Sequence, residues 1–80
     1  MKKELCIKQI YDDFINKVIL TKIEKEVLDL YIRDISIISM ADKLNVGTTT
    51  ISRTIAILKD KYKKYKQLEI EKLRILDGVN

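Results

Sequence analysis

Apolar residues recur at intervals of three and four along this chain, which is the spacing of side chains on one face of an α-helix. The first such stripe lies between Lys3 and Ile19 and comprises Ile7, Ile10, Tyr11, Phe14, Ile15 and Val18. It predicts one N-terminal helix over residues 3–19. Packing of this helix on the rest of the domain is favoured over binding to a partner.

A second helix is predicted after Thr21. The segment Thr21-Lys-Ile-Glu24 has the pattern of a capping box, in which the threonine hydroxyl and the glutamate side chain satisfy each other's backbone amides. The helix ends near Arg33-Asp34, and its buried stripe is Ile23, Val27, Leu30 and Tyr31.

The segment from 35 to 44 contains enough β-branched residues to resemble a strand. Its apolar positions 37, 40, 41 and 44 nevertheless fit a helix better than an alternating pattern, and Ser36 is a suitable cap for it. From Thr49 onward there is no helix breaker before Gly78. One long helix and two helices with a bend between Lys63 and Gln67 both agree with this pattern.

Residues 40–55, MADKLNVGTTTISRTI, indicate a helix-turn-helix. The small Ala41 lets a second helix cross closely, Asn45 breaks the first helix, and Ile51 and Ile55 turn the second one back to the same core. Between the helices, Gly47-Thr-Thr-Thr50 supplies short polar side chains at a helix start, where DNA phosphates and base edges are met.

Composition narrows the class of protein. Eighty residues with no Pro, two Gly and many Lys, Glu, Leu and Ile predict a single domain over 1–80 that is all-α, with four to five helices. The lone Cys6 has no partner for a disulfide and is expected to be a small buried hydrophobe. Because the chain has no His, a zinc site and a histidine acid-base centre are excluded. We therefore expect no metal, no cofactor and no enzymatic activity.

Apolar runs are short and interrupted by charge, so no signal peptide or membrane span is predicted, and the expected location is cytoplasmic. The net charge of +4 is unevenly distributed: residues 48–66 contain six basic residues and one acidic residue. A basic stripe on one helix is typical of phosphate binding. The alternative for Lys61 to Lys66 alone is a solvated, lysine-rich face.

The chain resembles a known family over residues 20–62. The segment LTKIEKEVLDL at 20–30 is similar to the "LTxxExEVLxL" opening of the LuxR/GerE-type helix-turn-helix domain, and residues 35–58 resemble its positioning and recognition helices. Region 4 of bacterial sigma factors shares much of this pattern, and the sequence does not separate the two. The N-terminal helix, 1–19, and the C-terminal helical extension, 63–80, lie outside the resemblance.

The resemblance implies sequence-specific binding of double-stranded DNA, with the recognition helix 49–62 in the major groove and a homodimer built by the C-terminal helix. By position, the DNA-binding residues would be Thr48, Thr49, Thr50, Ser52, Arg53, Ala56, Lys59 and Lys63. Arg53 is the candidate for reading guanine, and a phosphate contact or a surface salt bridge is its alternative. Ile51, Ile55 and Leu58 match core positions.

Four departures from the family pattern matter. Asp34 and Asn45 stand where the family often has Gly, but both tolerate a positive φ, so the turns are expected to be kept. Ile37 and Ile38 replace polar residues, with Ile37 expected on the core face and Ile38 exposed. Gly47 stands where the family usually has Ser, so capping is expected to pass to Thr48.

Beyond Lys66 the sequence is again apolar, at Leu68, Ile70, Leu73, Ile75 and Leu76. We expect a dimer interface made by Tyr65, Leu68, Leu73 and Leu76, with packing inside one chain as the alternative. The predicted function is that of a small homodimeric transcriptional regulator. The alternatives are a protein-interaction module and a sigma-like module that acts with RNA polymerase or a regulator protein. Exposure of Arg53, Lys59 and Lys63 on one face would favour DNA. A merged patch of Ile38 and the C-terminal apolar face would favour a protein partner.

Overall fold

The computed structural model describes the backbone of residues 2–79 and the side chains of residues 2–68. It contains five helices: α1 (Lys2–Leu5), α2 (Lys8–Lys17), α3 (Lys22–Ile32), α4 (Ile37–Leu44) and α5 (Thr48–Val79). No strand occurs in the described backbone, so the predicted all-α class with four to five helices is confirmed.

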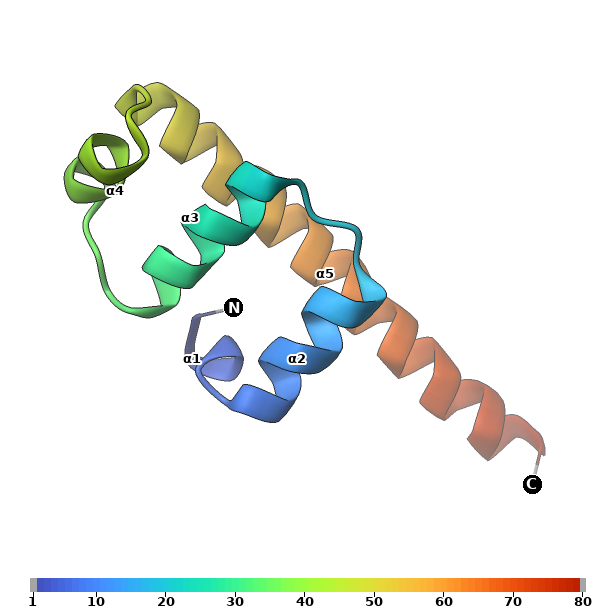
Figure 1. The fold of residues 1–80 in the computed structure, drawn as a ribbon. Helices are drawn as coiled ribbons and strands as arrows, with labels where there is room; N and C mark the ends of the chain where they lie inside the picture. Colours follow the sequence, from blue (N-terminus) through green and yellow to red (C-terminus); the bar gives the residue numbers. More distant parts are fainter. Residues whose placement is uncertain (1, 80) are drawn as a thin grey trace.

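The long helix α5 organises the molecule (Figure 1). Helices α3 and α4 pack against its N-terminal half, α2 packs against its middle, and its C-terminal part projects beyond the other helices. Its 32 residues span about 48 Å at a rise of about 1.5 Å per residue, which accounts for most of the 52 Å long axis. The backbone of α5 is unbroken from 48 to 79, so the structure adopts the single helix and not the bend near Lys63.

The prediction of one N-terminal helix over 3–19 is wrong, because the structure has two helices there, α1 and α2. Ile7, between them, has an extended backbone with φ −81° and ψ 118°. The reason lies in the core: Leu5 is 1% exposed and Phe14 is fully buried. These two residues are nine positions apart, so a continuous helix at about 100° per residue would place them on opposite faces. Breaking the helix turns both toward α5.

The break also explains why Cys6 is not the buried hydrophobe that we expected. Cys6 is exposed, and its thiol donates a long hydrogen bond to the Ile32 carbonyl oxygen at 3.6 Å. The preceding residue, Leu5, is buried in the core instead, and the Cys6 side chain therefore points outward.

The predicted caps of α3 and α4 are confirmed. The Thr21 amide donates to Glu24 Oε1 at 2.9 Å, and the Glu24 amide donates to Thr21 Oγ1 at 3.3 Å, which completes the capping box. Ser36 Oγ accepts the Ser39 amide at 3.2 Å and begins α4.

The core is formed where α3 and α4 meet α5, and it extends to α1 and α2 through aromatic rings. The predicted core residues Met40, Ile51 and Leu58 are all at most 1% exposed. The complete set of buried apolar residues is Leu5, Phe14, Leu20, Val27, Leu28, Met40, Ala41, Ile51, Ile55, Leu58, Tyr62 and Tyr65. Ile37 is a correction: it is 40% exposed because it is the first helical residue of α4 and lies at the edge of this core. Ile38 is 75% exposed, as predicted.

Candidate nucleic-acid interface

Helix α4, the turn 45–47 and the start of α5 form the predicted helix-turn-helix. The turn depends on Asn45, which has φ 56° and ψ 46°. The Val46 amide donates to the Ala41 carbonyl at 3.0 Å and the Asn45 amide donates to the Asp42 carbonyl at 3.4 Å, which is the hydrogen-bond pattern of a Schellman motif. An Asx residue therefore occupies the left-handed position that usually needs Gly, as we expected.

The C-terminal end of α3 has the same Schellman motif. Asp34 has φ 64°, the Ile35 amide donates to the Leu30 carbonyl at 3.1 Å, and the Asp34 amide donates to the Tyr31 carbonyl at 3.2 Å. Both turns that direct the chain into and out of α4 therefore have defined left-handed caps.

The start of α5 differs from the prediction that Thr48 is its cap. Thr48 is the first helical residue, and the Ile51 amide donates to the Gly47 carbonyl at 3.3 Å, so Gly47 occupies the cap position. Gly47 has no side-chain oxygen to accept an amide. The first amides of α5 thus have no capping side chain at Gly47, and the three threonines at 48–50 beside them are exposed.

The outer face of α5 contains every predicted DNA-binding residue. All eight are exposed, namely Thr48, Thr49, Thr50, Ser52, Arg53, Ala56, Lys59 and Lys63. Between them, the residues of the inner face are buried, namely Ile51, Thr54, Ile55 and Leu58. The structure therefore brings the predicted site residues together on the side of α5 that the other helices leave free.

Helical register places most of these residues in one line. Thr49, Ser52, Arg53 and Ala56 follow the i, i+3, i+4, i+7 spacing of a single helix face. Lys63 continues that line two turns after Ala56, and Lys59 lies at its edge. Asp60 interrupts the line with a negative charge, but its carboxylate pairs with Lys64 Nζ at 3.1 Å.

The six basic residues of 48–66 fall into two groups. Lys61, Lys64 and Lys66 each lie within 4.0 Å of a carboxylate oxygen, on Glu24, Asp60 and Glu4 respectively. Among the side chains described, Arg53, Lys59 and Lys63 form no ion pair. The positive charge left without a carboxylate is therefore on the predicted residues of the outer face.

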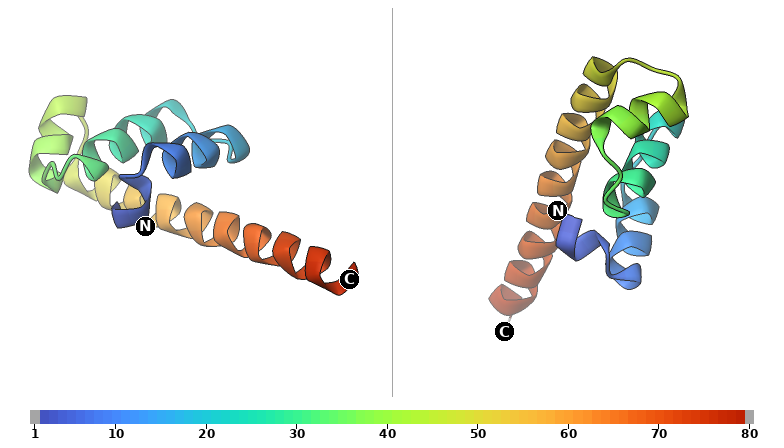
Figure 2. Two further views of the ribbon diagram at one scale, coloured as in Figure 1. Left: turned by 90° about the horizontal axis from the view of Figure 1, so that it is seen from below. Right: turned by 90° about the vertical axis from the view of Figure 1, so that its left-hand side faces the viewer.

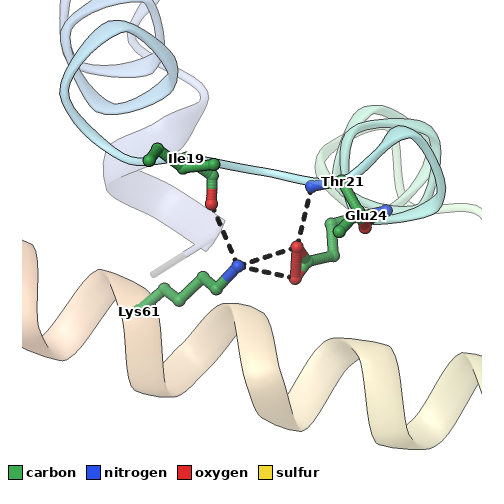
Figure 3. A network of polar contacts seen from close by, with 4 residues as sticks. All are labelled: Ile19, Thr21, Glu24 and Lys61. Atoms are coloured by element: carbon green, nitrogen blue, oxygen red, sulfur yellow. Dashed lines mark hydrogen bonds and ion pairs between the residues drawn. The ribbon is translucent and has the colours of Figure 1, made fainter.

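Lys61 has a structural position that the sequence analysis missed (Figure 3). Its ammonium donates to Glu24 Oε1 at 2.8 Å, to Glu24 Oε2 at 2.9 Å and to the Ile19 carbonyl at 3.0 Å. Glu24 is 4% exposed. The network joins the corner between α2 and α3 to α5. A sequence signal existed, because position 61 falls on the same arc as the core residues Leu58 and Tyr65.

The environment of Glu24 also determines its ionisation. Burial alone would raise the pKa of this carboxyl, but hydrogen bonds from Lys61 and from the amide and hydroxyl of Thr21 outweigh it and lower the pKa below the ordinary 4.5. The group is therefore charged and paired at neutral pH.

Two tyrosines on α5 attach the N-terminal helices. The Tyr62 hydroxyl donates to Glu4 of α1, and the Tyr65 hydroxyl donates to Asp13 of α2. The Phe14 ring contacts both edge-on, at centroid distances of 5.4 Å to Tyr62 and 5.3 Å to Tyr65. The hydrogen bond from Tyr62 lowers the pKa of Glu4, and burial, followed by the bond to Glu4, raises the pKa of Tyr62.

This cluster corrects the prediction that Tyr65 belongs to a dimer interface. Tyr65 is 7% exposed because its ring packs inside the same chain, so it has little surface for a second copy. Leu68, in contrast, is 59% exposed. The predicted interface residues Leu73 and Leu76 lie outside the side chains that the structure describes.

Leu68 borders an apolar groove that the sequence did not predict. The groove has a volume of about 570 Å³, and Ile19 at its rim is 90% exposed. Its lining residues are Lys17, Val18, Ile19, Lys61, Lys64, Tyr65 and Leu68. Helix α4, with the exposed Ile38, packs near the opposite end of α5 (Figure 1), so Ile38 and the Leu68 region form two separate apolar areas.

Other site types find no support in the described part of the chain. No group of three or more His, Cys, Asp or Glu residues gathers there in a way that could hold a metal ion. Across residues 2–79, none of the helices combines the length and the apolar content that crossing a bilayer requires.

Comparison of the chain with protein-family models, with curated proteins and with solved structures finds no match.

Proposed function

We propose that this chain binds double-stranded DNA with sequence specificity and that the outer face of α5 lies in the major groove. One observation supports this proposal most strongly. Within the second helix of a helix-turn-helix, three basic residues of the exposed surface, Arg53, Lys59 and Lys63, have no carboxylate partner among the described side chains. Unpaired cations on one exposed helix face suit a polyanionic partner.

Each part of the face has a role that its chemistry suits. The Arg53 guanidinium can donate two hydrogen bonds to guanine O6 and N7, which distinguishes guanine from the other bases. Free amides and hydroxyls in the first turn of α5, at Thr48 to Thr50, suit a phosphate next to a helix N-terminus. Ser52 and the methyl group of Ala56 would contact base edges. Lys59 and Lys63 would contact the sugar-phosphate backbone of the DNA.

The proposed process is control of transcription in the cytoplasm, through binding and without catalysis.

We propose a homodimer, in which Leu68 and the groove beside it contact a second copy. A two-fold arrangement would place two recognition helices about 34 Å apart, which is one turn of DNA. Leu68→Glu should then yield a monomer in light scattering, whereas Ile57→Glu, at the similarly exposed Ile57, should not. A wild-type chain that is monomeric at micromolar concentration would remove the dimer from this proposal.

Binding to DNA is tested by titration of labelled duplexes at several salt concentrations. The logarithm of the affinity should fall linearly with the logarithm of the salt concentration, with a slope of about −0.9 for each phosphate neutralised. Arg53→Ala should cost about 1–3 kcal/mol on a site selected from a random library, and much less on random DNA. Arg33→Ala is the matched control, because Arg33 is exposed at the C-terminal end of α3 and pairs with Asp29 at 3.4 Å. A flat salt response would reject the proposal.

A second candidate function rests on Ile38, which is 75% exposed at the start of α4. A large apolar side chain on the positioning helix suits a protein partner better than a phosphate. In this alternative the chain is a protein-interaction or sigma-like module that acts with RNA polymerase or a regulator. Ile38→Ser would then abolish binding to purified RNA polymerase, whereas Arg53→Ala would leave it unchanged.

A further inference from the structure

A second groove lies between α1 and the middle of α5. The right-hand view of Figure 2 shows α1, in blue, beside the long helix. The groove has a volume of about 640 Å³. Its lining residues are Lys2, Lys3, Glu4, Tyr31, Lys59 and Tyr62. Two lysines of α1 and one lysine from the middle of α5 therefore border one hollow.

Two of the charged groups in this groove already have partners. Lys2 pairs with Asp34, and its ammonium lies 5.8 Å from the centroid of the Tyr31 ring. Glu4 accepts the Tyr62 hydroxyl, and one of its carboxylate oxygens lies 4.0 Å from Lys66 Nζ. The negative charge of the groove is thus occupied by contacts that hold α1 on α5.

The remaining two lysines differ from these. Lys3 and Lys59 are both exposed, and neither forms an ion pair with a side chain that the structure describes. Burial of Leu5 and the bond between Glu4 and Tyr62 fix α1 where Lys3 borders the same groove as Lys59. Two like charges held beside one hollow repel each other, and a bound anion between them would remove this cost.

The groove is continuous with the outer face of α5 through Lys59. Lys59 follows Arg53 by six residues, which is about 9 Å along the helix axis. The major groove of DNA is about 12 Å wide. If Arg53 meets a base edge, residues at this distance along the helix arrive at the sugar-phosphate backbone that borders the groove.

We propose that Lys3 and Lys59 together bind one backbone phosphate of the duplex, so that α1 extends the DNA interface of α5. This inference rests on the proposed function. A lysine ammonium is a compact charge with three donors on a flexible stem, which suits a phosphate and does not distinguish bases. The break between α1 and α2 therefore brings Leu5 into the core and also places Lys3 beside the recognition helix.

The test is the salt dependence of duplex binding by the full chain. Lys3→Gln/Lys59→Gln should reduce the steepness of the log–log slope by about 0.9, the value for one phosphate. Between 50 and 200 mM salt, the double variant would thus lose about 3.5-fold less affinity than the wild type. The loss of affinity at low salt should be equal on selected and random duplexes, because a phosphate contact has no sequence preference.

Lys25→Gln is the matched control, because Lys25 is exposed on α3, the helix that packs against the inner face of α5. It should leave the slope unchanged, and thermal melting should show that all variants stay folded. An unchanged slope in the double variant, or a loss confined to the selected site, would overturn this inference alone. If the wild type shows no salt-dependent binding, both this inference and the proposed function fail.

Discussion

The two faces of α5 differ in how their polar groups are used. On the inner face, Thr54 Oγ1 donates to the Thr50 carbonyl at 2.7 Å, Lys61 pairs with Glu24, and the Tyr62 hydroxyl bonds to Glu4. Within the described residues, no buried side-chain nitrogen or oxygen lacks a hydrogen-bond partner. On the outer face, Arg53, Lys59 and Lys63 form no ion pair with any side chain that the structure describes. The polar groups of the inner face are therefore used in contacts within the fold, whereas these three cations remain available to a ligand.

Lys61 and Lys63 allow the sharpest test of this difference, because they are two residues apart on the same helix. Lys61→Met should lower the free energy of unfolding by about 1–3 kcal/mol, since it leaves the buried Glu24 carboxylate without its charged partner. Lys63→Met should change stability by less than about 0.5 kcal/mol and should weaken DNA binding. Urea denaturation and duplex titration of both variants measure the two effects. Equal losses of stability in Lys61→Met and Lys63→Met would contradict the proposed difference between the inner and outer faces of α5.

The left-handed turn at Asn45 sets the position of the outer face, and its substitution should have the next largest effect. Asn45→Val should destabilise the chain by about 1–3 kcal/mol, because a β-branched residue is strained at positive φ. Asn45→Gly should be neutral or slightly stabilising. Thermal denaturation checks this prediction, and matching melting temperatures for the two variants would contradict the turn geometry.

Acid should weaken the inner face selectively. The folded-state pKa of Glu24 lies below the ordinary 4.5, so its contribution to stability is complete above that pH and is lost as the pH falls through the folded pKa. Glu4, whose pKa is also lowered, acts in the same direction. We expect the free energy of unfolding to fall as the pH drops below about 4.5. The fall should be smaller in Lys61→Met, and equal acid dependence of the two chains would contradict the role of this network.

The smallest expected effect is at the first turn of α5. A Cβ added at Gly47 would meet nothing within 4 Å, and Gly47 does not have a positive φ. Gly47→Ser should therefore stabilise the chain by a few tenths of a kcal/mol, because the new hydroxyl can cap the helix. Thermal melting of Gly47→Ser, with Gly47→Ala as the variant that lacks the hydroxyl, checks this prediction. A larger gain from Ala would show that capping is not the cause.

Local signals in the sequence predicted much of this structure. Thr21, Ser36, Asp34 and Asn45 begin or end helices through hydrogen bonds to residues at most five positions away, so a short segment contains all the necessary information. The inner face of α5 also followed from spacing alone, because Ile51, Ile55 and Leu58 repeat with the helical period.

The features that were not predicted depend on distant contacts. The break before Ile7 arises because Leu5 and Phe14 must reach one core, which the apolar stripe from Ile7 to Val18 does not reveal. The burial of Tyr65 depends on Phe14 and Asp13 of α2, and the separate role of Lys61 depends on Glu24. A charge count treats Lys61, Lys63 and Lys64 as equivalent, and only the tertiary structure distinguishes them.

Mapping the bound surface by nuclear magnetic resonance tests the central claim most directly. A ¹⁵N-labelled chain is titrated with a duplex selected from a random library, and the backbone amide signals are followed. We expect the largest shifts at the outer face of α5 from Thr48 to Lys63, with little change at Lys25 on α3. Shifts centred on Ile38, shifts confined to the groove between Ile19 and Leu68, or no shifts at all would contradict DNA binding by this face.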